Sequence, residues 1–203
     1  MLFSDRYIEC VGLGKGNLRE RGSRFLSFAI PVKSELEIKI KLQELKVFYA
    51  DATHHCYAWV LHPDKSAQRF NDDGEPANTA GRPILRAIMS KDITNVLVVV
   101  VRYYGGTNLG IPGLINAYGA AANLALVDSK TDEKYIEDNF QLSTSFENEQ
   151  EIHRLMATFG ARVLGSEYLE GVCYKIAVKR SATEGFLKAA KENYLVELSI
   201  LNY

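Results

Sequence analysis

One short region limits the fold more than any other, because a run of β-branched apolar residues is followed at once by a glycine-rich turn. The run NVLVVVV occupies residues 95–101, and the turn RYYGGTNLG occupies residues 102–110. An unbroken apolar run of this kind predicts a strand that is buried on both faces. The small-residue segment after the turn predicts a helix over residues 110–127.

The glycine junction is compatible with two roles. Gly105, Gly106 and Gly110 place free backbone N–H groups near the positive end of a helix dipole, which attracts anions. The segment matches neither the GxGxxG fingerprint nor a GxxxxGK(S/T) loop, since no lysine follows the last glycine. Glycine also permits a tight turn and a close approach of helix to sheet. Spacing alone therefore leaves packing and phosphate binding open.

The first half of the chain predicts a mixture of strands and helices. Strand patterns occur at residues 7–13, 24–32 and 54–62. Helical patterns occur at residues 34–50, with Ser34 as the N-cap, and at residues 79–91, with Thr79 as the N-cap. The segments at residues 14–23 and 128–138 are interpreted as a charged turn and a charged linker.

The second half predicts a separate unit from about residue 137. Strand patterns lie at residues 139–146, 161–171, 172–180 and 194–201, with helical patterns at residues 148–160 and 182–193. Asn148 with Glu151 resembles a capping box, Gly160 is expected to end the first helix, and Ser181 to cap the second. The order βαββαβ is typical of a ferredoxin-like sandwich.

Composition and charge exclude several classes of protein. With 24 basic and 25 acidic residues the net charge is −1, which lacks the basic excess of a dedicated nucleic-acid binder. The start of the chain lacks a secretory pattern, and no run reaches the apolar length of a membrane span. Cys10, Cys56 and Cys173 are odd in number and far apart, so we expect buried free thiols. We expect a cytoplasmic protein.

Candidate polar residues gather around the loop NDDGEPAN at residues 71–78. Asp73 and Glu75 are ligand types for a hard cation, although Asn, Asp, Gly and Pro are also ordinary turn residues. His54 and His55 are adjacent on a strand, so they point to opposite faces and cannot share one metal. A partly buried, hydrogen-bonded histidine and a general base are both compatible with this pattern.

Basic residues crowd the turn at residues 14–23 and its flank. They are Lys15, Arg19, Arg21 and Arg24. Together with Tyr103, Tyr104 and Trp59 they are compatible with a surface that contacts a phosphate backbone and stacks bases. A solvated hairpin tip explains the same charges.

Four segments resemble the signature blocks of the IMPACT family, also called the YigZ family. They are GSRF, ATHHCYAW, DDGEPANTAG and VVVVRYYGGTNLGIPGLINAYG, in this order within residues 10–127. The resemblance implies a ribosomal protein S5 domain 2-like fold for residues 1–130. It implies similarity to the last domain of elongation factor G for residues 137–203, and an association with regulation of translation.

The chain departs from the family pattern at the glycine turn. Asn108 and Asn116 stand where the family usually has a lysine and an arginine, and Asn78 and Pro112 each replace a glycine. Two positive charges are therefore missing beside the expected anion site, which weakens phosphate binding. The partnership that eukaryotic members make through an added RWD domain is not expected here, because the chain starts almost directly on the first strand.

We therefore predict a non-enzymatic α+β protein of two domains that contacts RNA or the ribosome, with no catalytic residue, metal, cofactor or membrane partner. The expected binding residues are His54, Asp73, Glu75, Thr79, Arg82, Arg102, Tyr103, Gly105, Gly106, Thr107, Asn108 and Gly110. An enzyme that binds a phosphate ligand or nucleotide in the same cleft, and a protein-interaction module, are the alternative hypotheses.

Overall fold

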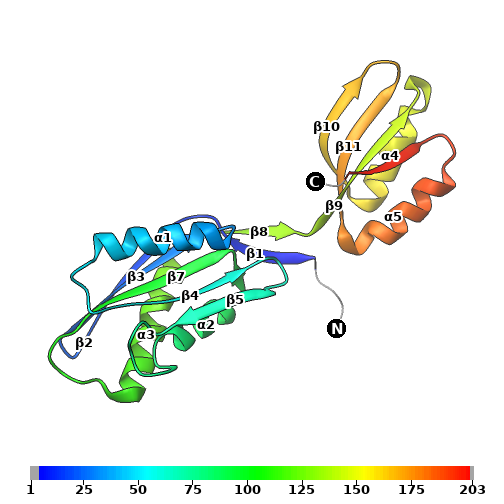
Figure 1. Cartoon of the computed structure of the whole chain (residues 1–203). Coiled ribbons are helices and arrows are strands. Elements are labelled where there is room, and N and C mark those ends of the chain that lie inside the picture. The colour runs from blue at the N-terminus through cyan, green and yellow to red at the C-terminus, as the bar shows by residue number, and fades with distance from the viewer. Residues whose placement is uncertain (1–4, 202–203) are drawn as a thin grey trace. The chain divides into compact units, whose positions relative to one another are not determined.

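The computed structural model describes residues 5–201, and the chain divides into two compact units (Figure 1). The first unit is Tyr7–Lys134. The second unit consists of residues 135–201 together with residues 5 and 6. The chain therefore crosses between the units twice.

A five-stranded antiparallel sheet forms the centre of the first unit. In order across the sheet, its strands are β2 (Gly14–Glu20), β3 (Ser23–Pro31), β7 (Val96–Tyr103), β4 (His54–Leu61) and β5 (Ala67–Asn71). The apolar run forms β7, and every residue of this strand from Val96 to Val101 is fully buried. The prediction of a strand buried on both faces is confirmed.

Helices cover both faces of this sheet (Figure 1). On one face lies α1 (Glu35–Phe48), whose first turn is capped as expected, because the Ser34 hydroxyl accepts a hydrogen bond from the Glu37 amide. Trp59, Val99 and Val101 belong to the core on this face. The other face carries α2 (Gly81–Ser90) and α3 (Gly110–Asp128).

Two expected loops contain strands. Residues 14–23 include β2, and the expected linker includes β8 (Thr131–Tyr135). The strand β8 joins β1 (Arg6–Cys10) and β6 (Ile93–Thr94) in a second sheet of order β6-β1-β8. Main-chain pairing explains how such polar segments form strands, since every side chain of β8 is exposed.

The helix α3 is the core helix of the first unit. Ala117, Tyr118 and Ala121 are buried, and the Ser27 hydroxyl donates a hydrogen bond to the Ala121 carbonyl. Among the described residues, α3 alone is long and apolar enough to cross a membrane by length and composition, a test that buried helices of soluble proteins also pass. The expectation that no segment reaches this length is thus wrong for α3, whose buried residues belong to the core of the first unit.

The second unit is an antiparallel sheet of order β10-β11-β9-β12 with two helices. Along the chain its elements are β9 (Glu137–Thr144), the short helix η1 (Phe146–Asn148), α4 (Glu149–Phe159), β10 (Arg162–Tyr168), β11 (Val172–Lys179), α5 (Arg180–Glu192) and β12 (Glu197–Leu201). The predicted βαββαβ order is observed. Phe140, Ile152 and Phe186 lie at the centre of its core.

The helix ends in the second unit follow the sequence only in part. Gly160 adopts the left-handed conformation that ends α4, as expected. The capping box is wrong, because Asn148 makes no side-chain cap bond and the Glu151 carboxylate accepts from Asn193 instead. Ser181 does not cap α5 either, since the helix begins at Arg180 and the Ser181 amide donates to the Asp5 carboxylate.

Candidate functional site

A buried ion pair lies on the α2 and α3 side of the central sheet. The Arg102 Nη1 atom is 2.5 Å from Glu75 Oε1, and both side chains are almost fully buried. The same Glu75 oxygen accepts a hydrogen bond of 2.7 Å from the Tyr118 hydroxyl. Arg102 Nη2 also donates to the Ser23 hydroxyl at 3.3 Å. The Glu75 carboxylate therefore neutralises the positive charge of the buried Arg102 guanidinium.

Arg102 still has an unused donor. Its Nε atom is buried and has no hydrogen-bond partner among residues 5–201. The guanidinium lies between the rings of Phe25 and Tyr104, with its Cζ atom 5.4 Å and 5.5 Å from their centroids. It borders a pocket of about 430 Å3. A buried donor without a partner is costly, so the Nε atom is the one described side-chain group of this kind that the fold leaves unsatisfied.

The two adjacent histidines point to opposite faces of β4, as predicted. His54 Nδ1 lies 2.7 Å from the Asp73 carbonyl oxygen, which can only accept, so we infer that Nδ1 carries the proton. His54 Nε2 lies 3.9 Å from Glu75 Oε1. His55 Nε2 lies 3.1 Å from the Tyr49 carbonyl oxygen, and burial lowers the His55 pKa. Both histidines are hydrogen-bonded; His54 is partly buried and His55 is buried.

In the loop before α2, the carboxylates of Asp72 and Asp73 accept hydrogen bonds from main-chain amides. Asp72 Oδ1 accepts from the amides of Ala80 and Gly81 at 3.0 and 2.8 Å, which satisfies the first N–H groups of α2. The expectation that Thr79 caps this helix is wrong, because its hydroxyl donates to the Pro76 carbonyl. Within the described chain, no group of three or more His, Cys, Asp or Glu side chains is placed to hold a metal.

The glycine-rich turn combines tight packing with exposed amides. A Cβ on Gly105 would lie 1.9 Å from the carbonyl carbon of Gly22, so this position admits only glycine. Gly106 has a φ of 83°, in the left-handed region, with open space around it. Residues 105–108 are exposed, and the amides of residues 106–108 make no hydrogen bond within the described chain. Packing explains Gly105, while an anion can reach the amides after it.

The structure brings together only part of the predicted site. The residues lining the pocket beside Arg102 include His54, Glu75, Asn108 and Gly110. Gly105, Gly106 and Thr107 form the exposed turn that precedes Asn108. Asp73 supports His54 and His55 through its main chain and carboxylate, and Thr79 is buried away from the pocket lining.

Two predicted site residues lie elsewhere. Tyr103 follows Arg102 on β7, so its side chain points to the α1 face, where its hydroxyl donates to Asp51. Arg82 lies on α2 and lines a different pocket. Trp59 is buried in the core under α1, so the expectation that it belongs to a basic aromatic surface is wrong.

Sequence reasoning missed Ser23 and Tyr118, which complete the polar contacts of Arg102 and Glu75. Tyr118 had a visible signal, because it is the one tyrosine in the alanine-rich segment of α3. Burial and the neighbouring carboxylate raise its pKa, so the hydroxyl stays a donor. Ser23 had no signal, since only the pairing of β3 with β7 brings it near Arg102.

A basic stripe runs across the sheet beside the turn. In the register of β2, β3 and β7, Arg19 pairs with Arg24 and Arg24 pairs with Tyr103, so the three side chains share the α1 face. Neither Arg19 nor Arg24 has an ion-pair partner within residues 5–201, whereas Arg21 lies 3.8 Å from Glu20. We call Arg19, Arg21, Arg24, Tyr103 and residues 105–108 the hairpin–turn surface.

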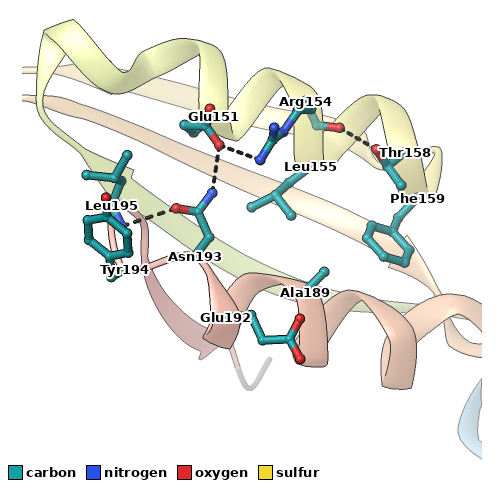
Figure 2. Close-up of a pocket in the computed structure, with 10 residues that line it drawn as sticks. All are labelled: Glu151, Arg154, Leu155, Thr158, Phe159, Ala189, Glu192, Asn193, Tyr194 and Leu195. Atoms are coloured by element: carbon teal, nitrogen blue, oxygen red, sulfur yellow. Dashed lines mark hydrogen bonds and ion pairs between the residues drawn. The ribbon is translucent and has the colours of Figure 1, made fainter.

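The second unit contains a pocket of about 490 Å3 between α4 and α5 (Figure 2). The Glu151 carboxylate lines it, pairs with Arg154 and accepts a hydrogen bond from Asn193 (Figure 2). Asn193 in turn accepts from the Leu195 amide. Several polar groups of this pocket thus bond to one another. Fewer of them are available to bind a charged ligand than in the first unit.

The first unit is an α+β domain in which three helices cover a five-stranded sheet. It contains the buried Arg102–Glu75 pair and displays the basic stripe and the glycine-rich turn. A family model described as the Impact N-terminal domain matches residues 21–126. The chain is 34% identical over 166 residues to IMPACT family member YigZ of Escherichia coli (strain K12), covering 81% of each protein. The chain therefore belongs to the IMPACT family.

Two further comparisons cover different shares of the chain. IMPACT family member YvyE of Bacillus subtilis (strain 168) is 39% identical over 104 residues, which is 51% of this chain and 48% of that protein. A crystal structure described as a hypothetical protein is 29% identical with a TM-score of 0.66, and the match covers 99% of this chain and 98% of that one.

Proposed function

We propose that this IMPACT family protein is a translation-related regulator that binds RNA, free or within the ribosome, through the hairpin–turn surface. Family membership supports the link to translation. The observation that carries RNA binding is the contact of Gly22 with Gly105, which holds the arginines of the hairpin beside the exposed turn. Arginine side chains and free main-chain amides both bind phosphate oxygens.

The positive charge of the site comes from the hairpin. Glu75 neutralises the charge of Arg102, so Arg102 has a structural role. Its guanidinium lines the pocket of about 430 Å3 and packs against the Tyr104 ring. Tyr104 is 47% exposed, and its hydroxyl donates to Asn108 Oδ1 at 3.2 Å. Tyr104 lies outside the hairpin–turn surface, on the Arg102 side of the sheet, and adjoins that surface through Gly105. A ring fixed at one end and open to solvent is suited to stacking on an unpaired base.

We also propose the finer fold assignments. The strand order β10-β11-β9-β12 supports a ferredoxin-like sandwich for residues 137–203, and the helix-covered mixed unit supports an S5 domain 2-like fold for residues 1–130. The division of the chain between Lys134 and Tyr135 supports two domains. A cytoplasmic location agrees with a partner that is RNA or the ribosome.

The direct test is RNA binding in a salt titration. We expect the wild-type protein to bind single-stranded RNA at about 50 mM salt, where phosphate contacts are favoured. Arg19→Gln with Arg24→Gln should weaken binding about tenfold and lower the salt slope by roughly 1.4. The matched control is Lys188→Gln with Lys191→Gln, which removes the same charge from exposed positions of α5. Absence of wild-type binding at low salt would refute the proposal.

A protein-interaction function is the second candidate, and one observation favours it. The helix α1 exposes four large apolar side chains, which are Leu36, Ile40, Val47 and Phe48, at 68%, 49%, 67% and 77% exposure. Apolar patches of this kind often mark contact sites. Retention of a protein partner from nuclease-treated lysate by the wild type, and its loss with Val47→Asp and Phe48→Asp, would favour this candidate over RNA.

An enzyme in the cleft beside Arg102 is supported less well. The guanidinium that would bind a phosphate is already paired with Glu75, and the carboxylates of Asp72 and Asp73 hold main-chain amides. Stabilisation by a nucleotide with magnesium, unaffected by Arg19→Gln and Arg24→Gln and abolished by His54→Ala, would favour the enzyme.

A further inference from the structure

A second pocket of the first unit lies between β5 and α2, with a volume of about 810 Å3. Its lining includes three guanidinium-bearing residues, Arg69 on β5 and Arg82 and Arg86 on α2, and the apolar residues Phe70, Leu85 and Met89. The strand β5 ends the order β2-β3-β7-β4-β5, so the pocket lies beside an edge strand of the sheet. It belongs to neither the hairpin–turn surface nor the cleft beside Arg102.

Arg82 and Arg86 lie one helical turn apart on α2 without a counter-charge. Neither guanidinium has a hydrogen bond or ion pair with any residue between 5 and 201, and both residues are exposed. Like charges at this spacing repel one another and weaken a helix slightly. An anion bound between them would relieve the repulsion.

The acidic residues of the adjoining loop are all engaged elsewhere. Asp72 accepts main-chain amides at the start of α2, and Asp73 accepts the His55 amide and pairs with Lys46. Glu75 is buried with Arg102. These three carboxylates are therefore engaged by other groups, and no acidic residue is among the described residues that line the pocket.

The apolar part of the pocket lies on the same side of the sheet as the arginines. Phe70 pairs with Ala58, whose side chain belongs to the core beneath α2 and α3, so the Phe70 ring faces the helix side of β5. Phe70 is 37% exposed and Met89 is 41% exposed. A partly open aromatic ring and a thioether in a pocket with three guanidinium groups suit a ligand that has a flat apolar part and an anionic part.

We propose that this pocket binds a nucleoside phosphate, with the phosphate on Arg82 and Arg86 and the base against Phe70. The fork of an arginine matches phosphate oxygens in pairs, and every base offers a face for stacking. Nucleoside phosphate comes from two sources, which are a free nucleotide and a nucleotide within an RNA strand. The chemistry of recognition is the same for both.

Calorimetric titration of the full-length protein with AMP, and with inorganic phosphate, tests the free source. Fluorescence anisotropy with an end-labelled oligouridylate tests the RNA source. Arg82→Gln with Arg86→Gln should weaken the ligand that binds by at least about tenfold. Phe70→Ala should weaken AMP or the oligouridylate and leave inorganic phosphate unchanged, which separates base stacking from phosphate contact.

The double variant Lys188→Gln with Lys191→Gln again controls for lost charge, and circular dichroism checks that each variant is folded. Binding of AMP that Arg82→Gln with Arg86→Gln abolishes assigns the pocket to a free nucleotide. Binding of oligouridylate alone, with the same loss, assigns it to RNA. The proposal is overturned if that variant changes the affinity for neither ligand, and this result leaves the hairpin–turn surface untouched because Arg19 and Arg24 are intact.

Discussion

Gly22 and Gly105 are in direct main-chain contact, with the turn between β2 and β3 held against the end of β7. A Cβ built on Gly105 meets the Gly22 carbonyl carbon at 1.9 Å, and one built on Gly22 meets the Gly105 oxygen at 2.8 Å. No side chain can be added at Gly105 without moving the hairpin. The basic stripe and the exposed turn thus depend on one another for their positions.

Gly105→Ala should therefore lower the free energy of unfolding by about 1–3 kcal/mol, because the added methyl group overpacks a main-chain contact. It should also weaken RNA binding. Urea unfolding followed by circular dichroism measures the first effect. Gly165→Ala, at a glycine with open space around its Cβ position, is the control. Equal stability of the two variants would contradict the packing role of Gly105.

Glu75→Ala should be among the most destabilising substitutions in the first unit. It leaves the Arg102 guanidinium buried without a counter-charge, which costs about 3–5 kcal/mol. Glu167→Ala breaks an exposed ion pair with Lys175 and should cost much less stability than Glu75→Ala, because solvent screens exposed pairs. Chemical unfolding of both variants at neutral pH makes the comparison. A loss at Glu75 as small as that at Glu167 would show that Arg102 finds another partner.

Asp72→Ala should destabilise the start of α2 by about 1–2 kcal/mol, the usual cost of losing an N-terminal cap. Asp72→Asn keeps an acceptor oxygen and should retain most of that stability. Hydrogen exchange of the amides at Ala80 and Gly81 reports the effect where it arises. If these amides stay equally protected in Asp72→Ala, the carboxylate does not hold the helix end.

Stability should fall in acid partly through Glu9. Burial opposes ionisation of this carboxyl, but hydrogen bonds from Lys33 and Asn95 outweigh it and lower its pKa below the ordinary value of 4.5. Its folded pKa lies below its unfolded pKa, so the stabilisation is present above about pH 4.5 and is lost as the pH falls through the folded value.

The variant Glu9→Gln removes that titration. Compared with the wild type, it should be less stable at neutral pH and should lose less stability between pH 6 and about pH 3. Urea unfolding across this pH range gives both curves. Parallel curves for the two proteins would show that Glu9 does not contribute to the acid sensitivity.

The sequence predicts those parts of the fold that depend on local patterns. The buried strand β7, the helix α3 and the order of elements in the second unit follow from apolar runs and periodicity. The strand β2 lies where the sequence predicts a turn, because its glycines resemble loop residues. A Cβ on Gly14 would lie 2.1 Å from the Ala125 oxygen, so glycine here lets α3 pack against the strand.

The candidate site was less predictable because its contacts join distant segments. Arg102 and Glu75 were both expected near the site, but nothing in their spacing indicates that they neutralise one another. The spacing of Asp72 also gives no sign of its role. Its carboxylate accepts the amides at the start of α2 from eight and nine residues away, whereas the sequence predicts Thr79 as the N-cap. Pairing partners of this kind are decided by the folded sheet.

Asp5 precedes β1 in the chain but belongs to the second unit. Its carboxylate accepts the Ser181 amide at 2.9 and 3.1 Å, and its carbonyl accepts the Ile136 amide. A residue that precedes β1 therefore completes the hydrogen bonding of the second unit. A fragment that begins at residue 137 lacks Asp5 and should be less stable than one in which Asp5 is retained. The first unit is therefore an insertion in the sequence of the second unit.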